Sequence, residues 1–398
     1  MQELLSFQNN LLSQVNDDWS RYLYPILKGK ERLLGLKGLR GVGKTTMLLQ
    51  YLAYDWKDME TGMYVSADHP YFYTNTLFDF AQSWYANGGK LLLIDEVHKY
   101  PNWSRELKLI YDGHPNMQVY FTSSSALDLY RGESDLSRRL ISRELHGMSF
   151  REFLELRHGL KTDPVELNKL LDKRPDLQSF FTGDQKPLRL FKQYLREGYF
   201  PFATDDMANT VSERIYQVVN TVLESDLVTI MSFNAANVSS LKKLLGVIAQ
   251  SAPFQPNISQ IASKLQLGRS TLVQYLKNLH DARLLNLVVR HGKGSSLLQK
   301  PDKVYFENNS FSYAYQADPN IGTIRETFFL NQLRNAGHDV NLASHGDFLV
   351  DDRWTFEIGG KSKGSAQVRH HTDSFLALDD IEYGMGRTIP LWHFGFLY

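Results

Sequence analysis

Residues 32–53 read RLLGLKGLRGVGKTTMLLQYLA, an apolar run that passes through glycines into apolar residues at helical spacing. The segment contains the pattern GxxxxGK[ST], which starts at Gly38 and ends at Lys44 and Thr45. A strand before this pattern and a helix after it are the context in which it folds as a phosphate-binding loop. The stretch therefore predicts a P-loop NTPase core, an α/β fold with an αβα sandwich.

The residues of this loop have separate tasks in phosphate binding. Glycines let the backbone wrap the phosphates, so that successive N–H groups and the helix N-terminus face their negative charge. Lys44 is expected to reach the β- and γ-phosphates, and Thr45 is expected to ligate Mg²⁺. The predicted nucleotide-binding residues are Gly38, Gly41, Val42, Gly43, Lys44, Thr45, Thr46 and Asp95.

Asp95 and Glu96 follow a second apolar run, residues 91–94, which predicts a strand buried on both faces of a parallel sheet. Asp95 stands at the carboxyl end of that strand, where open α/β sheets place ligand-binding groups. We expect it to hold Mg²⁺, directly or through water. Glu96 could polarise the attacking water as a general base. An apolar run ending in Asp-Glu is a weak signal alone, and the preceding phosphate loop makes it specific.

A third predicted strand, within MQVYFTSSSALDL, ends in polar residues. Thr122 or Ser123 could sense the γ-phosphate, or the serines could simply cap a helix. Further on, Arg138 and Arg139 are adjacent. One of them could act as an arginine finger on the transferring phosphoryl group, in the same or a neighbouring subunit, or the two could form a solvated pair.

The base of the nucleotide is predicted by elimination. A GTPase needs an NKxD motif, and the nearest approach, Asn168-Lys169, is followed by two leucines without an aspartate in register. ATP is therefore the preferred nucleotide, with Mg²⁺ as its metal.

Composition excludes several classes of protein. The 398 residues predict two to four domains, and 44 basic residues against 44 acidic ones exclude a global field that recruits nucleic acid or membrane. The absence of cysteine excludes disulfides and thiolate metal sites. Without a signal-peptide pattern or an apolar run long enough to span a membrane, we expect a soluble cytoplasmic protein with no membrane partner.

Four segments, GLRGVGKTT, LLLIDEVHKYPNW, FTSSSALDLYRGESDLSRRL and MSFREFLEL, resemble the prokaryotic AAA+ ATPases related to the archaeal ATPase group. Those proteins carry a C-terminal domain of unknown function, and the resemblance spans essentially the whole chain. It implies an AAA+-type core that hydrolyses ATP. The family's Gly-Arg after the sensor strand reads Arg138-Arg139 here, so Arg139 takes the arginine's place and joins Lys44 and Glu96 as a predicted catalytic residue. Ser123 replaces a glycine that the family usually has.

Residues 151–250 show helical periods and predict a helical lid. Within it, YLREGYFP resembles a Gly-Pro turn of the family's lid, carried by Gly198 and Pro201, although a simple helix-terminating turn explains it equally well.

Residues 251–300 predict a winged helix-turn-helix, with a tight turn at Gly268, a helix over 270–280 and a β-wing after it. From Asn257 to Lys300 there are seven lysines and arginines against one acid, Asp281. The side chains placed for base or phosphate contacts are Arg269, Gln274 and Lys277. The sequence leaves open whether this domain binds DNA or another protein.

Residues 301–398 predict a helix, then short strands that bear Asp347 and Glu357, with a buried closing strand in 388–398. This order resembles a restriction-endonuclease-like fold, in which two carboxylates hold Mg²⁺ and a lysine two positions after the glutamate helps activate water. Gly359 stands at that lysine position. Lys361 shares the strand face one step further on, but the pair Gly359-Gly360 favours a bulge. The sequence therefore favours a degenerate nuclease fold that serves in binding or regulation.

Together these features predict four parts: an AAA+-type P-loop core (1–150), a helical lid (151–250), a winged helix (251–300) and a small α/β nuclease-like domain (301–398). The predicted function is ATP hydrolysis as a conformational switch, with DNA, a partner protein or a further copy of the chain as partners. Two alternatives stay open: an ATP-gated DNA-processing enzyme with an active nuclease, and a nucleotide-binding scaffold that does not hydrolyse ATP.

Overall fold

The structure is a computed structural model that describes residues 1–123, 136, 138–172, 175–183, 185–204, 210–231, 233–251, 256–290, 300–364 and 373–398. Contacts between residues divide the chain into two compact units. The first comprises residues 1–146 and 225–232, and the second comprises residues 147–224 and 233–398. The regions predicted as winged helix and C-terminal domain, and most of the predicted lid, fall in the second unit. The four-part division itself remains a prediction.

A five-stranded parallel sheet forms the centre of the first unit, in the order β2-β3-β4-β1-β5. Its strands are β1 (Leu33–Lys37), β2 (Gly62–Ser66), β3 (Leu91–Asp95), β4 (Gln118–Ser123) and β5 (Ile141–Glu144). The helices are α1 (Gln2–Leu12), α2 (Lys44–Gln50), α3 (Leu77–Ala86), α4 (Trp103–Gly113) and α10 (Leu227–Met231). β1, the strand before the phosphate loop, pairs with both β4 and β5 and so lies inside the sheet.

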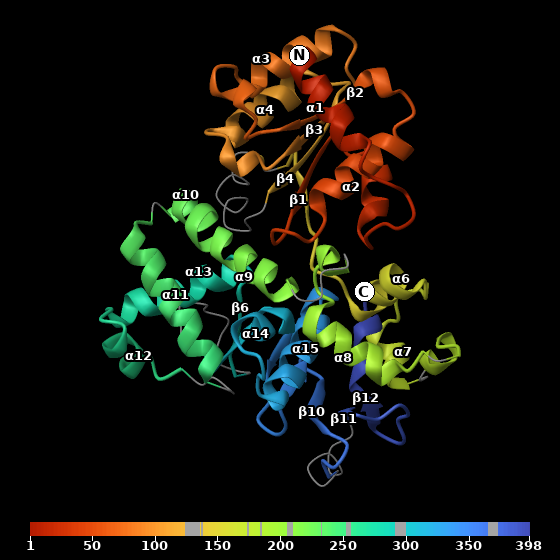
Figure 1. Ribbon diagram of the computed structural model, residues 1–398, viewed down its shortest axis with the longest axis vertical. Coiled ribbons are helices and arrows are strands. Elements are labelled where there is room, and N and C mark those ends of the chain that lie inside the picture. Colours follow the sequence, from red (N-terminus) through yellow and green to blue (C-terminus); the bar gives the residue numbers. More distant parts are fainter. Residues whose placement is uncertain are drawn as a thin grey trace. The chain divides into compact units, whose positions relative to one another are not determined.

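Helices cover both faces of this sheet. Alternate residues of β2, β3 and β4, including Val65, Ile94 and Phe121, pack in one hydrophobic core with residues of α3 and α4. On the other face, the ring of Tyr120 lies 5.8 Å from that of Tyr51, in the π-helical turn that directly follows α2. Figure 1 shows α3 and α4 on one side of the strands and α2 on the other. The first unit therefore has the predicted αβα layers.

The second unit begins with helices. They are α6 (Phe150–His158), α7 (Leu167–Asp172), α8 (Pro187–Glu197), α9 (Val211–Thr221), α11 (Ala235–Gln250), α12 (Ile258–Lys264) and α13 (Arg269–Asp281). An antiparallel pair follows, β6 (Leu285–Val288) with β7 (Lys303–Phe306). Thus α12, α13 and β6 lie within the predicted winged helix, whereas β7 lies beyond its predicted end at residue 300. Residues 291–299 of the predicted wing lie outside the described residues.

The end of the chain forms a second sheet, in the order β12-β11-β10-β9-β8. Its elements are α14 (Asn309–Tyr315), α15 (Ile321–Asn335), β8 (Val340–Leu342), β9 (Phe348–Val350), β10 (Trp354–Gly360), β11 (Ser374–Asp379) and β12 (Thr388–Pro390). β8, β9 and β10 are antiparallel neighbours, whereas β10, β11 and β12 run parallel. Phe329 of α15 packs on this sheet, with its ring 4.9 Å from that of Phe356.

Two sequence predictions for this region are wrong. The closing strand covers only residues 388–390 and then turns into a 3₁₀ helix, η9 (Leu391–Phe396). Pro390 lacks the N–H group that would continue the ladder, which explains the early end. The favoured bulge is also absent, because Gly359 and Gly360 pair in continuous register with Leu378 and Asp379.

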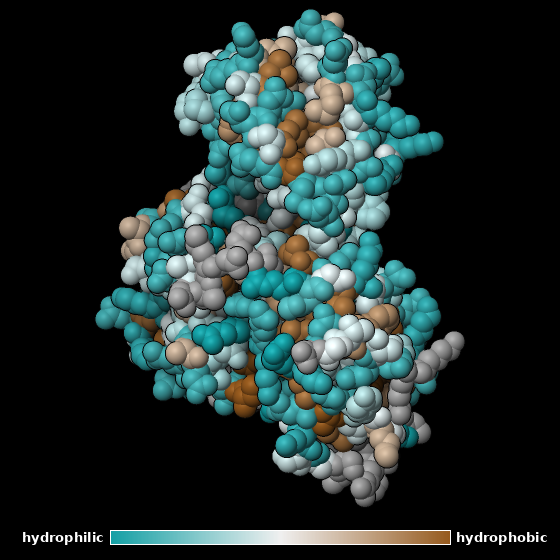
Figure 2. All heavy atoms as spheres, turned by 45° about the vertical axis from the view of Figure 1, so that its right-hand side comes forward, coloured by the Kyte–Doolittle hydropathy of each residue, from teal (hydrophilic) through white to brown (hydrophobic). Residues whose placement is uncertain are grey.

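No helix among the described residues is both long and apolar enough to cross a membrane. On the face drawn in Figure 2, hydrophilic residues dominate and hydrophobic ones form separate patches between them.

Candidate nucleotide site

The phosphate loop is shaped by its glycines and held by an arginine. Gly43 has φ 97° and lies directly before α2, and Gly38 has φ 151°. A Cβ atom on Gly38 would come within 2.3 Å of the Leu145 carbonyl oxygen, so only glycine fits there. The guanidinium of Arg21 donates to the carbonyls of Val42 and His146, the latter at 2.8 Å. The loop is therefore tied to the end of β5.

Lys44 lies buried in the centre of the loop, with 5% of its surface exposed. Its Nζ donates to the carbonyl oxygens of Gly38 at 2.8 Å and Leu39 at 3.0 Å. Burial lowers the pKa of Lys44, against the opposing charges of Glu96 and Asp95. The ammonium is thus held beside the backbone groups predicted to receive phosphates.

Asp95, at the end of β3, accepts hydrogen bonds from three hydroxyl groups. Its Oδ2 accepts from Thr45 Oγ1 at 2.7 Å and from Tyr64 Oη at 2.9 Å, and its Oδ1 accepts from Thr122 Oγ1. The sheet order explains these partners, because β4, which carries Thr122, lies between β1 and β3. Thr45 and Asp95 provide the hydroxyl and carboxylate oxygens that Mg²⁺ prefers, so the residues present fit that metal.

Glu96 has a strained backbone, and its carboxylate lies close to basic side chains. Its φ of 54° is in the left-handed region, which is uncommon for residues other than glycine and often marks functional sites. Its N–H donates to Thr122 Oγ1 at 3.0 Å. Its Oε2 lies 2.8 Å from a guanidinium nitrogen of Arg40 and 3.6 Å from His98 Nε2.

A second carboxylate reaches this cluster from far along the chain. Asp226, which ends the π-helical turn Val222–Asp226, belongs to the first unit and has 2% of its surface exposed. Its Oδ1 lies 3.7 Å from Arg40 and 3.8 Å from His98 Nε2. Arg40 and His98 therefore each lie between Glu96 and Asp226.

The structure brings most predicted site residues together but leaves one elsewhere. The loop residues, Asp95 and Glu96 are adjacent. Thr122 and Ser123 are fully buried, and Thr122 connects Asp95 with Glu96. Arg139 instead binds Asp112 on α4 with two hydrogen bonds of 2.8 and 3.0 Å. A finger role in a neighbouring subunit stays a prediction, and residues 124–135 before it lie outside the described residues.

Sequence reasoning missed four side chains of the site: Arg40, Tyr64, His98 and Asp226. Arg40 and His98 lie within the quoted motifs, in positions to which the motifs assign no chemistry. Tyr64 looks like any strand residue, since its hydroxyl function depends on β2 pairing with β3. Asp226 stands in a helical segment 131 positions after Asp95, and no sequence pattern indicates that this segment returns to the first unit.

The predicted contact residues of the second unit have different exposures. Arg269 and Gln274 are exposed on α13, and Lys277 is half-buried. Gln274 donates to Asn278 Oδ1 at 2.8 Å. Lys361 is exposed, while Asp347 and Glu357 approach a different lysine, Lys363.

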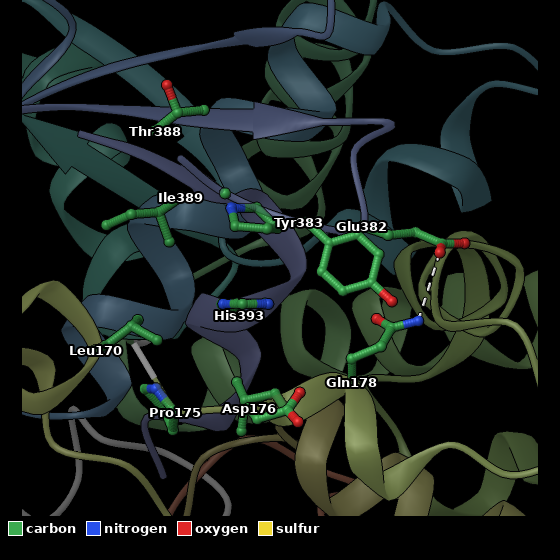
Figure 3. Close-up of a pocket in the computed structure, with 12 residues that line it drawn as sticks. Leu170, Pro175, Asp176, Gln178, Glu382, Tyr383, Thr388, Ile389 and His393 are labelled. Atoms are coloured by element: carbon green, nitrogen blue, oxygen red, sulfur yellow. Dashed lines mark hydrogen bonds between the residues drawn. The ribbon is translucent and has the colours of Figure 1, made fainter. Parts of the chain in front are cut away.

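A pocket of about 190 Å³ in the second unit contains none of the predicted site residues. In the view of Figure 3, Leu170 and Ile389 lie to the left of His393, and Tyr383 and Gln178 lie to its right. Gln178 donates to Glu382 at 3.4 Å. Burial lowers the pKa of His393 to about 3, so its imidazole is neutral at physiological pH.

Comparisons with known proteins agree with the geometry of the first unit. Residues 30–154 match a family described as AAA domain, and residues 188–318 match one described as Domain of unknown function (DUF8612). The first unit thus has a P-loop NTPase α/β fold and is similar to the AAA domain family over the matched residues. The second match crosses the predicted borders near residues 250 and 300, and so it does not follow the four-part division.

Individual relatives are distant. An uncharacterized protein of Methanocaldococcus jannaschii is 29% identical over 318 residues, which are 74% of this chain and 67% of that protein. A Walker-type ATPase of Pyrococcus abyssi aligns with a TM-score of 0.43 at 13% identity, over 76% of this chain and 97% of that one. AMPPCP-bound DnaA from Aquifex aeolicus aligns with a TM-score of 0.30 at 14% identity, over 66% and 88%.

Proposed function

We propose that this protein binds ATP with Mg²⁺ and hydrolyses it, and that the hydrolysis serves a conformational change. The observation that carries the proposal is the 2.7 Å hydrogen bond between Thr45 of the phosphate loop and Asp95. It joins the two oxygen ligands that a P-loop site needs beside the buried ammonium of Lys44. An apolar strand ending in Asp-Glu elsewhere in the sheet would not produce this contact.

Each residue then has a role in the proposed reaction. Loop N–H groups from Gly38 to Thr46 bind the phosphate oxygens, and Lys44 turns from the loop carbonyls toward the β- and γ-phosphates. Thr45 and Asp95 would hold Mg²⁺, which neutralises phosphate charge when it is bound. Tyr64 and Thr122 fix the orientation of the Asp95 carboxylate through their hydrogen bonds.

Glu96 is the proposed general base, and Arg40 controls its availability. While Oε2 of Glu96 accepts the 2.8 Å bond from the Arg40 guanidinium, that oxygen is occupied and is not free to accept a proton from the attacking water. Arg40 belongs to the phosphate loop and lies close to where phosphate charge is expected. Bound nucleotide would therefore draw the guanidinium from Glu96, and this release would link water activation to ATP binding.

The test compares nucleotide binding with turnover. Lys44→Ala should abolish tight ATP binding, since it removes the cation that faces the β- and γ-phosphates. Glu96→Gln should bind ATP normally and hydrolyse it roughly 10²- to 10⁴-fold more slowly, because only proton transfer is lost. Binding is measured by calorimetry and turnover by phosphate release. Hydrolysis at the wild-type rate in Glu96→Gln would exclude Glu96 as the general base. ATP binding without turnover in the wild type would favour the alternative of a nucleotide-binding scaffold that does not hydrolyse ATP.

DNA is the proposed macromolecular partner, through α12, α13 and the β6–β7 pair acting as a winged helix. Arg269, the first residue of α13, is exposed, and this end of the helix is where recognition helices approach nucleic acid. Protein contact remains the alternative, and the salt dependence of binding separates the two. A cytoplasmic location and self-assembly also remain predictions.

A further inference from the structure

Asp347, Glu357 and Lys363 meet at β10, the central strand of the second sheet: Asp347 directly precedes β9, Glu357 lies on β10 and Lys363 follows β10. Lys363 Nζ lies 2.6 Å from Glu357 Oε1 and 3.5 Å from Asp347 Oδ2. It also donates to the backbone carbonyl of Ile358 at 2.6 Å. Asp347 Oδ2 is fixed in turn by the Ile358 N–H at 2.7 Å. The two acids predicted for a nuclease site are therefore together, and an ammonium lies between them.

The side chain of Lys363 reaches the two carboxylates by crossing Gly359. This glycine stands two positions after Glu357, where a nuclease of this fold would have its lysine. A Cβ atom on Gly359 would lie 2.2 Å from Lys363 Cδ, so the lysine stem passes directly over Gly359. A turn closed by the Lys363 N–H and the Gly360 carbonyl at 3.0 Å brings the chain back over the strand. Any larger residue at position 359 would displace the stem. Lys361, by contrast, lies beyond the end of β10 and is exposed.

A divalent metal would fit this site only if the oxygen atoms of the site were available as ligands. A nuclease metal would take the two carboxylates and the neighbouring backbone carbonyl as ligands. Those three oxygens belong to Glu357, Asp347 and Ile358, and all of them already face the Lys363 ammonium. Within the described part of the chain, no group of three or more His, Asp or Glu side chains is placed to hold a metal. The residues present therefore do not fit a metal while Lys363 stays in place.

The charge state of Lys363 agrees with this role. Burial disfavours its ammonium, but the hydrogen bond to Glu357 and the charges of Asp347 and Glu357 outweigh that effect and raise its pKa. The lysine stays charged across the physiological range, so it offsets one of the two carboxylate charges without any added ion.

We propose that Lys363 is a built-in cation that occupies the place of a divalent metal between Asp347 and Glu357. The wild-type chain then carries a latent metal site and no metal-dependent nuclease centre. Removing the ammonium while keeping the stem over Gly359 should open the site to Mg²⁺ or Mn²⁺.

The experiment counts bound Mn²⁺ by electron paramagnetic resonance on the full chain without nucleotide. Wild type and Glu357→Gln should bind the same number of ions, because the site is filled by the lysine. Lys363→Met should bind one more ion per chain than the double variant Lys363→Met/Glu357→Gln. Any Mn²⁺ in the first unit is common to all four proteins and cancels in each comparison.

Lys361→Met is the matched control, since it removes the same charge two residues away from an exposed position. It should gain no ion. Circular dichroism checks the fold of each variant, and the comparison of wild type with Glu357→Gln decides the point even if Lys363→Met fails to fold. The proposal is overturned if wild type binds one ion more than Glu357→Gln, if folded Lys363→Met gains none, or if wild type cleaves DNA or RNA in a way that Glu357→Gln abolishes.

Discussion

Arg40 lies between two carboxylates of the first unit, 2.8 Å from Glu96 and 3.7 Å from Asp226. The two acids therefore compete for one guanidinium. If Asp226 loses its charge, Arg40 will bind Glu96 more firmly, and the proposed base will be less available. Asp226 would then be a positioning residue that acts on water activation through Arg40.

The prediction is that Asp226→Asn lowers kcat and leaves the KM for ATP nearly unchanged. A loss of about 1 kcal/mol of interaction with Arg40, roughly fivefold in kcat, is the expected size for a 3.7 Å ion pair in which Asp226 is buried and Arg40 is partly exposed. Asp226→Glu keeps the charge and should restore most of the rate. Steady-state kinetics of both variants provide the measurement, and an unchanged or increased kcat in Asp226→Asn would contradict the role.

For single residues, the sequence was informative where a motif assigns a chemical role to a position. Lys44, Thr45, Asp95 and Glu96 lie together as predicted, because a P-loop strand and an acid-bearing strand of one parallel sheet must end at the same edge. Asp226 could not be predicted, since its position depends on a later segment returning to the first unit.

Helix α13 presents its first residue, Arg269, to solvent, whereas Lys277 is half-buried near Asp281. Burial raises the pKa of Asp281, and the charge of Lys277 opposes that rise. If the winged helix binds DNA, Arg269 is the better placed phosphate contact. We expect Arg269→Ala to reduce the slope of log Kd against log salt by roughly one unit, and Lys277→Ala to reduce it less. Fluorescence anisotropy at several salt concentrations measures the slopes, with exposed Lys361→Ala as the control. No DNA binding at low salt would assign α13 to protein contact.

The 3₁₀ helix η9 carries His393, whose pKa burial lowers to about 3. The unfolded chain takes up this proton near pH 6.5 and the folded chain only near pH 3, so the contribution of His393 to stability is complete above pH 6.5 and declines as the pH falls. At pH 5 the loss is about 2 kcal/mol.

Replacing His393 by a residue that does not titrate should remove this part of the pH dependence. His393→Gln and His393→Phe should therefore show a smaller fall in unfolding free energy between pH 7 and pH 5 than the wild type. Denaturant titrations at the two pH values, followed by a signal from the second unit, give the comparison. An equal fall in all three proteins would show that His393 is protonated in the folded state.

Helices and strands were predictable where the hydrophobic periodicity of a segment agrees with the turn-forming residues at its ends. Strands β1, β3, β4 and β10 follow apolar or alternating runs, and α15 ends near Gly337 as expected. The predicted closing strand at the end of the chain is wrong after Pro390. The apolar residues there suit a buried 3₁₀ helix as well as a strand, and composition does not separate the two. The bulge predicted at Gly359-Gly360 is wrong for another reason. These glycines serve the close approach of the Lys363 and Arg325 side chains, and the ladder stays regular.

For the molecule as a whole, the chain leaves the first unit after residue 146, returns for residues 225–232 and leaves again. The returning segment carries α10 and Asp226, so its stability should depend on the nucleotide site. The neighbouring helices α9 and α11 belong to the second unit. No sequence pattern marks the borders at residues 225 and 232, since the segment has the same helical character as its neighbours.

Hydrogen exchange with and without a non-hydrolysable ATP analogue tests this division of the chain. Ligand at 100 times its Kd stabilises the unit that binds it by about 2.7 kcal/mol, or roughly a hundredfold in the protection of its slowest amides. Residues 225–232 should gain protection together with α2 and β3, while α9 and α11 should change much less. Lys44→Ala should abolish the gain in all of these segments, because it binds no analogue. If residues 225–232 keep their exchange rates while α2 and β3 gain protection, Asp226 does not sense the nucleotide, and the role assigned to it through Arg40 fails with that result.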